Sequence, residues 1–221
     1  MMIDELRQKL WKGANPLAGF PIRLIAEDSQ GWQSQHPFLG STIEAIRPRV
    51  VIEVGVWKGG STLTMAHRLK DLGIDGAVIA VDTWLGSWDH WVQPHWHEEL
   101  CFVNGYPHLF EKFAANVIHH GVQDFVVPLP LDSVNARNVI SAFGISADMI
   151  HIDGGHDYAA VMMDLIQWWP VLRQGGVFIG DDYNENGTGW PDVFRAVNDF
   201  LAQVPHTGFE FHSGKCRVIK A

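Results

Sequence analysis

The chain has 221 residues, and its 25 aspartates and glutamates outnumber its 16 lysines and arginines, which gives a formal net charge of −9. This acidic balance argues against a nucleic acid or an anionic membrane as partner. No stretch has the apolar pattern of a signal peptide or of a membrane-spanning helix. Two cysteines, Cys101 and Cys216, are too few for a disulfide scaffold or a metal cluster, so we expect a protein of the reducing cytoplasm.

The first 48 residues predict helices and loops, beginning with an amphipathic helical pattern over 1–16. From residue 49 onward, short β-branched runs alternate with helical patterns, which predicts βαβ units and a parallel sheet. Strands are expected at 49–55, 77–82, 124–130, 148–153 and 176–182. Helices are expected at 61–72, 107–120, 133–143, 158–173 and about 190–203, with Pro170 marking a kink or an end.

Two short runs near the end of the chain, FEFH and CRVIK, predict an antiparallel hairpin at one edge of the sheet. The sequence shows no internal repeat and no linker. The expected fold class is therefore α/β, with a doubly wound, mostly parallel seven-stranded sheet. We expect one domain over 1–221, formed by a helical N-terminal cap at 1–48 and a core at 49–221.

An acid stands at or near the carboxyl end of each of the five main strands. These acids are Glu53, Asp82, Asp132, Asp153 and Asp181, the last followed by Asp182. Ligands of open α/β sheets bind beyond the carboxyl ends of the strands. Carboxylates gathered at one edge are costly unless a cation or hydrogen-bond donors lie among them. The sequence therefore predicts a polar or cationic ligand at this edge.

The turn after the first strand reads VIEVGVWKGGST at residues 51–62. Its glycine spacing matches neither the dinucleotide fingerprint nor the phosphate-binding loop. Glu53 suits a ligand with a cationic end, and Asp82 can accept hydrogen bonds from both hydroxyls of a ribose. A nucleoside that carries a positive group and no pyrophosphate is S-adenosylmethionine, which is the expected cofactor. The alternative is that the glycines only permit a tight turn with close packing.

Residues 48–202 resemble class I S-adenosylmethionine-dependent methyltransferases, through VIEVGVWKGGST, AVDTW, LDS, HIDGGHDYAAVMMDL, GGVFIGDDY and GWPDVFRAVNDF. Through IDGGHDY and GDDY, the chain is similar more narrowly to the macrocin and mycinamicin sugar O-methyltransferases and the cephalosporin hydroxylase-like proteins. The resemblance implies a Rossmann-like methyltransferase fold. Position 155 is a glycine, whereas some relatives have a polar residue there. The stretch 84–97 has no counterpart in the pattern that the family shares.

The resemblance also implies roles for individual residues. It places Glu53, Gly55 and Gly59 at the methionine part of the cofactor, Asp82 at the ribose, and Asp132 and Ser133 near the adenine. The full set of candidate cofactor-binding residues is Glu53, Gly55, Gly59, Ser61, Asp82, Thr83, Trp84, Asp132 and Ser133. Asp153, Asp181 and Asp182 match the acids that bind a divalent metal in the sugar methyltransferases, and Mg²⁺ is the expected ion.

Methyl transfer to oxygen requires a hydroxyl that loses its proton, because a neutral hydroxyl is a poor nucleophile. An Mg²⁺ held by the three aspartates can orient two vicinal oxygens of the acceptor and lower the pKa of one. Asp153 or His156 is the candidate to take the proton. Two alternatives stay open: Asp181 and Asp182 as a helix cap with a solvated loop, and His156 as part of a helix-start turn. His151 is expected to be a core histidine.

Residues 83–105 form an insert that holds Trp84, Trp88, Trp91 and Trp96, four of the ten tryptophans. We expect an aromatic lid over the acceptor site, because rings stack on sugar or aromatic faces. A packing loop over the sheet edge is the alternative. A zinc site is a minor alternative, offered by His90, His95 and His97. Further candidates for acceptor contact are Tyr183, Asn184 and Trp190.

The leading functional hypothesis is an O-methyltransferase that uses S-adenosylmethionine and Mg²⁺ on a hydroxyl of a small molecule, such as a natural-product sugar. A second hypothesis keeps the cofactor without the metal and admits an oxygen or a nitrogen acceptor. A third is a non-catalytic S-adenosylmethionine-binding protein, which the intact set of acids disfavours. A dehydrogenase is disfavoured by the missing dinucleotide fingerprint. The sequence leaves the oligomeric state open, with a homo-oligomer as one option.

Overall fold

The computed structural model describes residues 1–28, 31, 33–184 and 186–221. Its N-terminal part contains α1 (Met2–Trp11), the short 3₁₀ helix η1 (Ile22–Leu24) and α2 (Pro37–Ile46). α1 buries Met2, Ile3 and Leu6, as its amphipathic pattern predicts. α2 begins with a proline, which lacks the N–H that the first helical position would leave unpaired.

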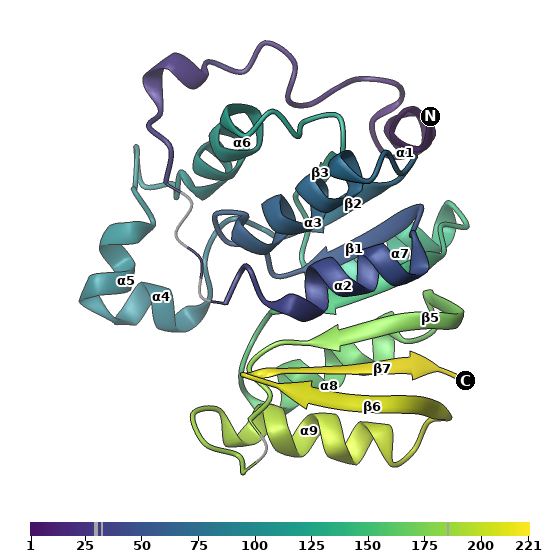
Figure 1. Cartoon of the computed structure of the whole chain (residues 1–221). Helices are drawn as coiled ribbons and strands as arrows, with labels where there is room; N and C mark the ends of the chain where they lie inside the picture. Colours follow the sequence, from purple (N-terminus) through teal and green to yellow (C-terminus); the bar gives the residue numbers. More distant parts are fainter. Residues whose placement is uncertain (29–30, 32, 185) are drawn as a thin grey trace.

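The sheet is formed by the β-branched runs of the sequence. Its strands are β1 (Val50–Val54), β2 (Ala77–Val81), β3 (Val126–Leu129), β4 (Ala147–Ile152), β5 (Leu172–Gly180), β6 (His206–His212) and β7 (Lys215–Lys220). In the described part of the chain their order is β3-β2-β1-β4-β5-β7-β6, with β1 to β5 parallel and the β6–β7 hairpin antiparallel (Figure 1). The prediction of a doubly wound, mostly parallel seven-stranded sheet is confirmed.

Helices cover both faces of this sheet (Figure 1). On one face pack α2, α3 (Gly60–Asp71) and α6 (Leu109–His119). On the other pack α1, α7 (Ser133–Ala142), α8 (Tyr158–Trp168) and α9 (Pro191–Leu201). Because both faces are covered, every residue of β1 and β2 is buried, which explains why these strands read as continuous apolar runs.

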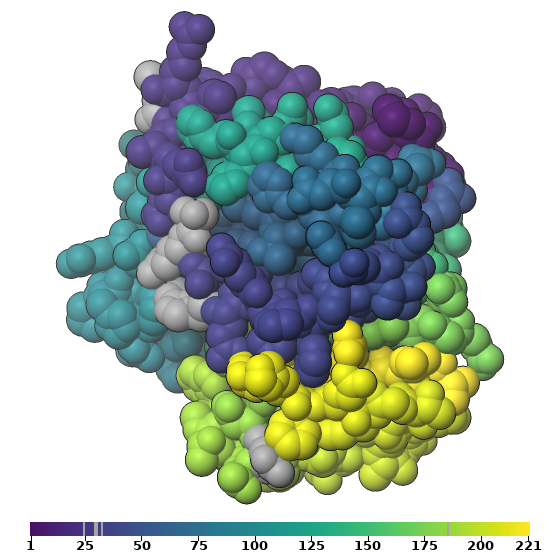
Figure 2. Space-filling view, viewed as in Figure 1, coloured from purple at the N-terminus to yellow at the C-terminus, as the bar shows by residue number. Residues whose placement is uncertain are grey.

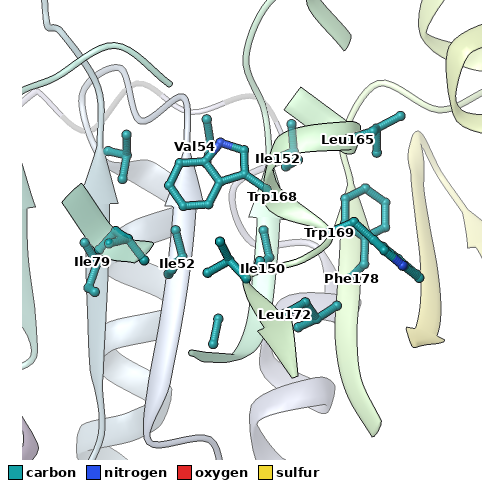
Figure 3. Close-up of a cluster of buried hydrophobic side chains, with 14 of the residues drawn as sticks. Ile52, Val54, Ile79, Ile150, Ile152, Leu165, Trp168, Trp169, Leu172 and Phe178 are labelled. Atoms are coloured by element: carbon teal, nitrogen blue, oxygen red, sulfur yellow. The ribbon is translucent and has the colours of Figure 1, made fainter. Parts of the chain in front are cut away.

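The core on the α8 side shows how the layers are held together. Ile52, Ile79 and Ile150, from three neighbouring strands, project from the sheet toward Trp168 of α8 (Figure 3). All four side chains are buried. Burial of each isoleucine stabilises the fold by roughly 1.5–3 kcal/mol relative to exposure. The sheet is therefore a rigid base for the residues at its carboxyl edge.

The fourth predicted helix is shorter than the expected range 158–173. α8 ends at Trp168, and β5 already begins at Leu172, before the expected start at 176. Pro170 explains the difference, because a proline has no N–H to continue the helical hydrogen bonds. The prediction that residues 169–173 are helical is wrong.

The insert 83–105 contains α4 (Trp88–Val92) and α5 (Pro94–Glu99). It projects from the side of the molecule toward which the carboxyl ends of the parallel strands point (Figures 1 and 2). The insert therefore lies at the edge where the acids were expected. None of the helices in the described ranges combines the length and the apolar character that crossing a bilayer requires.

Candidate active site

The strand register brings polar side chains of four neighbouring strands together. Glu53 in β1 lies opposite His151 in β4. At the other side of β4, Gly180 ends β5 opposite Cys216 of β7, so the adjoining residues Asp181 and Lys215 meet. Neighbouring strands lie about 5 Å apart, so side chains in register come within hydrogen-bonding reach.

Two glycines of the first turn are required by packing. Gly55 has φ +84°, and a Cβ at this position would lie 1.8 Å from the carbonyl oxygen of Asp153. Gly59 has φ +91°, and its Cβ would lie 2.8 Å from the ring of Phe113. Only glycine allows these approaches at these backbone angles. Gly55 therefore sets the end of β4, and with it Asp153, directly beside the turn.

Glu53 is the centre of a buried hydrogen-bond network. Its carboxylate accepts from the hydroxyls of Ser61 and Thr62, and His151 Nδ1 lies 3.1 Å from its Oε1. Glu53 and His151 are both fully buried. A buried carboxylate is stable only when its oxygens receive donors in this way. Glu53 and Ser61 are thus buried beside the turn, and their side-chain oxygens are hydrogen-bonded to each other.

Lys215 continues this network toward the aspartates. Its ammonium is fully buried, forms an ion pair with Asp181 Oδ2, and lies 3.4 Å from His151 Nε2. Because an ammonium only donates, His151 Nε2 is the acceptor of this contact, and Nδ1 carries the proton that is donated to Glu53. His151 is a core histidine, as expected, but it also connects Glu53 with the Lys215–Asp181 pair.

Asp153, Asp181, Asp182 and His156 converge at the edge of the sheet. Two sets have their ligand atoms within 4.8 Å of one another, His151 with Asp153 and Asp181, and Asp153 with His156 and Asp182. Of the predicted metal acids, Asp153 belongs to both sets, Asp181 to the first and Asp182 to the second. They line a small cavity of about 20 Å³ that continues toward α8 and α9.

The carboxyl groups of Asp153 and Asp181 differ in their affinity for protons. Burial and the charge of Asp181 raise the pKa of Asp153 well above its ordinary value. Burial alone would raise the pKa of Asp181, but Lys215, His151 and Asp153 together outweigh this effect and lower that pKa. Asp153 is therefore the member of the pair that binds a proton more readily.

His156 is held between a carboxylate and an indole. Its Nε2 lies 2.8 Å from Asp182 Oδ2, and its ring stacks on Trp190 with centroids 4.1 Å apart and planes 13° apart. Asp182 has φ +56°, an unusual backbone angle for a residue other than glycine. Strained residues of this kind occur where the surrounding structure fixes a functional geometry. The site therefore holds its histidine in one orientation.

Asp82 binds the first turn. One carboxylate oxygen accepts from the N–H groups of Val56 and Trp57, and the other accepts from the N–H of Trp84. The first oxygen thus has both of its lone pairs occupied, and the second keeps one for a further donor. Thr83 Oγ1 accepts from the N–H of Leu85. The structure thus gives Asp82 a role in holding the turn, beside the ribose contact expected from the sequence.

The indoles of Trp57 and Trp84 have different surroundings. Trp84 is buried against Phe110 and Phe113, and its Nε1 donates to the carbonyl oxygen of Trp57. Only the backbone of Trp84 therefore lies at the rim. The Nε1 of Trp57, by contrast, is buried with no hydrogen-bond partner among the described residues. An unpaired buried donor costs about 1–3 kcal/mol, so an oxygen of a bound ligand would be stabilising there.

Asp132 and Ser133 lie where β3 leads into α7. Asp132 caps this helix and accepts from the N–H of Asn135 at 3.0 Å. The hydroxyl of Ser133 donates to Asp164 of α8 and accepts from Trp168 Nε1 at 2.8 Å. Burial raises the pKa of Asp164 to about 6. Asp164, on α8, is thus a further acid near the expected adenine end.

Lys58 connects the turn to the N-terminal segment and to the insert. Its side chain is 1% exposed, and its Nζ lies 2.6 Å from Asp28 Oδ2 and 2.5 Å from Glu99 Oε2. The neighbouring Trp57 stacks on His90 of α4, with centroids 4.4 Å apart. Burial lowers the pKa of His90, and the charge of His156 adds to this effect. The insert is therefore held against the glycine turn.

The remaining candidates are placed as follows. His95 and His97 lie on the exposed part of α5, and neither candidate metal cluster of the described residues includes a histidine of the insert, so the zinc alternative gains no support. Tyr183 is buried among Phe194, Phe209 and Phe211, away from the open rim where it was expected to contact an acceptor.

Sequence reasoning missed Lys215, Lys58 and Asp164. Lys215 begins the hairpin strand β7, and only the pairing of β7 with β5 shows that it meets Asp181. Lys58 is part of the glycine turn, but its partners lie in segments with no recognisable pattern. Asp164 lies within an otherwise apolar helix, and an acid in such a helix was the one signal that could have been used.

Comparison with known proteins identifies relatives of this chain. A family model described as a methyltransferase domain matches residues 52–183, more than half of the chain. An uncharacterized protein of Sinorhizobium fredii, y4gI, is 25% identical over 185 residues, which cover 83% of this chain and 18% of that protein. The chain therefore spans about a fifth of the length of this relative.

Solved structures with the same fold include two O-methyltransferases. One is TomG from Streptomyces achromogenes, involved in tomaymycin synthesis and bound to S-adenosylmethionine, with a TM-score of 0.61 and 13% identity over 100% of this chain and 90% of that one. The other is an O-methyltransferase from Bacillus cereus in complex with S-adenosylhomocysteine, with a TM-score of 0.56 and 18% identity over 99% and 90%. At these identities, the likeness shows the fold alone.

Proposed function

The chain belongs to the methyltransferase-domain family, and from this membership we propose that it is an S-adenosylmethionine-dependent O-methyltransferase acting on a hydroxyl of a small molecule. The observation that carries the proposal is the cluster of Asp153, Asp181, Asp182 and His156 beside the glycine turn. Nucleophile activation and a cofactor site are thereby expected at one edge of the sheet.

The residues around the turn fit a sulfonium nucleoside, which supplies the electrophilic methyl group when bound. The buried N–H of Trp57 has no partner among the described residues, and Asp82 keeps one lone pair, on Oδ1, for a hydroxyl group. We propose that Gly55, Gly59, Thr83 and the backbone of Trp84 complete the wall near the turn. Asp132 and Ser133 lie at the proposed adenine end. Glu53 and Ser61 stabilise the turn through their buried hydrogen bond.

The acids at the edge also fit a divalent cation. Asp153, Asp181 and Asp182 offer hard oxygen ligands, and Lys215 is the one cation whose ion pair with them is described. Burial, and after it the negative charge of Asp181, raises the pKa of Asp153, and Lys215 offsets this only in part. We propose that the three aspartates hold Mg²⁺, which supplies positive charge that favours loss of the acceptor's hydroxyl proton.

His156 is the proposed proton acceptor. Asp182 can only accept from Nε2 of this histidine, so the proton of the neutral ring stays on Nε2 and Nδ1 is left free to take a proton. Trp190 covers one face of the ring and limits its rotation. Asp153 is the second candidate, and it acts as a base only after its own proton has left.

The insert 83–105 is the proposed lid of the acceptor site. Trp88 is 73% exposed and Trp190 is 42% exposed, although large aromatic side chains are usually covered in a folded protein. Such rings can stack on the apolar face of a sugar or an aromatic acceptor. Lys58 joins the insert to the cofactor turn through Glu99. A small hydroxylated acceptor, such as a natural-product sugar, is therefore the proposed substrate class.

One observation favours a second candidate, a methyltransferase that works without metal on oxygen or nitrogen. The positive charge of Lys215 already lies beside Asp181, and the His156–Asp182 pair can accept a proton without a metal ion. This candidate requires only the cofactor and the residues that the structure describes.

The test combines binding and turnover. Purified protein is titrated with S-adenosylhomocysteine in a calorimeter and then assayed with S-adenosylmethionine and a panel of hydroxylated small molecules, before and after EDTA treatment and after return of Mg²⁺. We expect binding of S-adenosylhomocysteine, loss of turnover in EDTA and recovery with Mg²⁺. Unchanged turnover after exhaustive chelation would select the metal-free candidate. Binding with no turnover on any acceptor would indicate a non-catalytic protein.

A matched pair of variants tests the acids. Asp181→Asn is expected to lower turnover at least 100-fold while the affinity for S-adenosylhomocysteine changes less than about twofold, because the cofactor turn keeps its own contacts. Asp71→Asn, which makes the same change at the exposed end of α3, is expected to leave both values unchanged. A fully active Asp181→Asn variant would contradict the role of the cluster.

A further inference from the structure

We propose that Lys215 is a positioning residue, whose ammonium holds the Asp181 carboxylate in the one orientation in which it can share a cation with Asp153. This inference rests on the proposed function only for the cation itself. Lys215 lies outside residues 52–183, the part of the chain that matches the methyltransferase-domain family.

The burial of Lys215 is the first observation. A charged ammonium removed from water is strongly unfavourable unless it is paired and hydrogen-bonded. Lys215 is fully buried, and its described partners are Asp181 and His151. Lys220 at the other end of the same strand donates instead to two backbone carbonyls, of Trp169 and Leu172. Only the lysine at the site end of β7 is paired with a carboxylate.

The second observation is that both oxygens of Asp181 are held. Oδ2 receives the Lys215 ammonium, and Oδ1 accepts from the N–H of Asp182 at 2.9 Å. With a donor on each oxygen, the carboxylate cannot turn without losing a contact. The antiparallel pairing of β5 with β7 fixes the lysine in turn, because Gly180 lies opposite Cys216. The orientation of Asp181 is thus set by the sheet.

The third observation concerns charge. Asp153 lies in one set with Asp181 and in a second set with Asp182, and without a cation beside them ionised carboxylates would repel one another. Lys215 supplies one positive charge beside Oδ2 of Asp181. Outer partners of this kind orient metal-binding carboxylates in other proteins, and their loss commonly weakens metal binding 10- to 100-fold.

The experiment compares two lysines of β7 with Mn²⁺ as the probe ion. Mn²⁺ binding to wild type, Lys215→Met and Lys220→Met is measured by calorimetry in the presence of S-adenosylhomocysteine, together with circular dichroism and melting temperature. Lys215→Met is expected to bind Mn²⁺ 10- to 100-fold more weakly, with the affinity for S-adenosylhomocysteine within twofold of wild type. Lys220→Met is expected to melt at a lower temperature and to keep the wild-type Mn²⁺ affinity.

An increase in Mn²⁺ affinity in the Lys215→Met variant is equally informative. If the lysine occupied the place of the cation, its removal would strengthen Mn²⁺ binding, and equal or tighter binding by Lys215→Met overturns the proposal. Should this variant fail to fold, Lys215→Gln, which can still donate a hydrogen bond, is expected to weaken binding by three- to tenfold, and wild-type affinity overturns the proposal. If the wild-type protein binds S-adenosylhomocysteine but no Mn²⁺, this result rules out both the cation of the proposed function and this role of Lys215.

Discussion

The inner half of the candidate site is built from the sheet, and the outer half is built from segments laid over it. In the inner half, Glu53, His151, Asp181 and Lys215 come from four neighbouring strands, and their polar atoms are paired with one another. In the outer half, Trp88 and Trp190 expose large rings to solvent. One half is closed and fully bonded, whereas the other is open.

This difference separates two tasks of an enzyme. Chemistry on a fixed set of atoms benefits from groups that are already oriented, because no reorganisation is needed during the reaction. Recognition of an acceptor benefits from apolar surface that can adjust to the shape of a ligand. We therefore expect substitutions in the inner half to change stability and turnover, and substitutions in the outer half to change the choice of acceptor.

The largest effect is expected from Glu53→Leu. This variant leaves two buried hydroxyl groups and His151 without their acceptor, so the free energy of unfolding should fall by about 4 kcal/mol. Glu98→Leu makes the same change on the exposed insert and should alter it by less than about 0.5 kcal/mol. Urea unfolding at neutral pH measures both. Equal losses in the two variants would show that the halves do not differ.

The inner half was largely predictable from the sequence because it follows from strands. Buried β-branched runs located β1 to β5, and an acid at each strand end located the rim, since parallel strands bring their carboxyl ends to one edge. For this reason, Asp153 lies close to Asp181 and to Asp182. The end of the helix at Trp168 was missed although Pro170 marked it, because apolar periodicity continued past the proline.

The contacts across the rim could not be predicted in the same way. The meeting of Lys215 with Asp181 depends on the hairpin register, which a run of six residues does not encode by itself. The partners of Lys58 lie in the insert and the N-terminal segment, whose positions follow from packing rather than from a repeating pattern. Nor does the sequence reveal that Trp84 turns into the core while Trp57 stacks on His90.

A pH dependence of intermediate size is expected from Asp164. Its pKa is raised to about 6 in the fold, against 3.8 as the ordinary value, so its protonated form stabilises the native state. This contribution is fully present below about pH 4 and is lost as the pH rises through 6, and it amounts to about 3 kcal/mol. Asp164→Asn cannot titrate. The difference in unfolding free energy between wild type and this variant should therefore shift by that amount between pH 4 and pH 7, and a constant difference would contradict the buried state of Asp164.

The smallest effect is expected where the two halves join. Lys58 is buried, but Glu99 is 37% exposed, so solvent and salt screen their ion pair. A double-mutant cycle with Lys58→Met and Glu99→Gln, read from urea unfolding, should give a coupling energy of about 1 kcal/mol that decreases in 0.5 M NaCl. A coupling above about 3 kcal/mol would assign this pair to the closed inner half. A coupling of zero would leave the stacking of Trp57 on His90 as the contact that holds the insert, and the insert would then remain docked when salt is added.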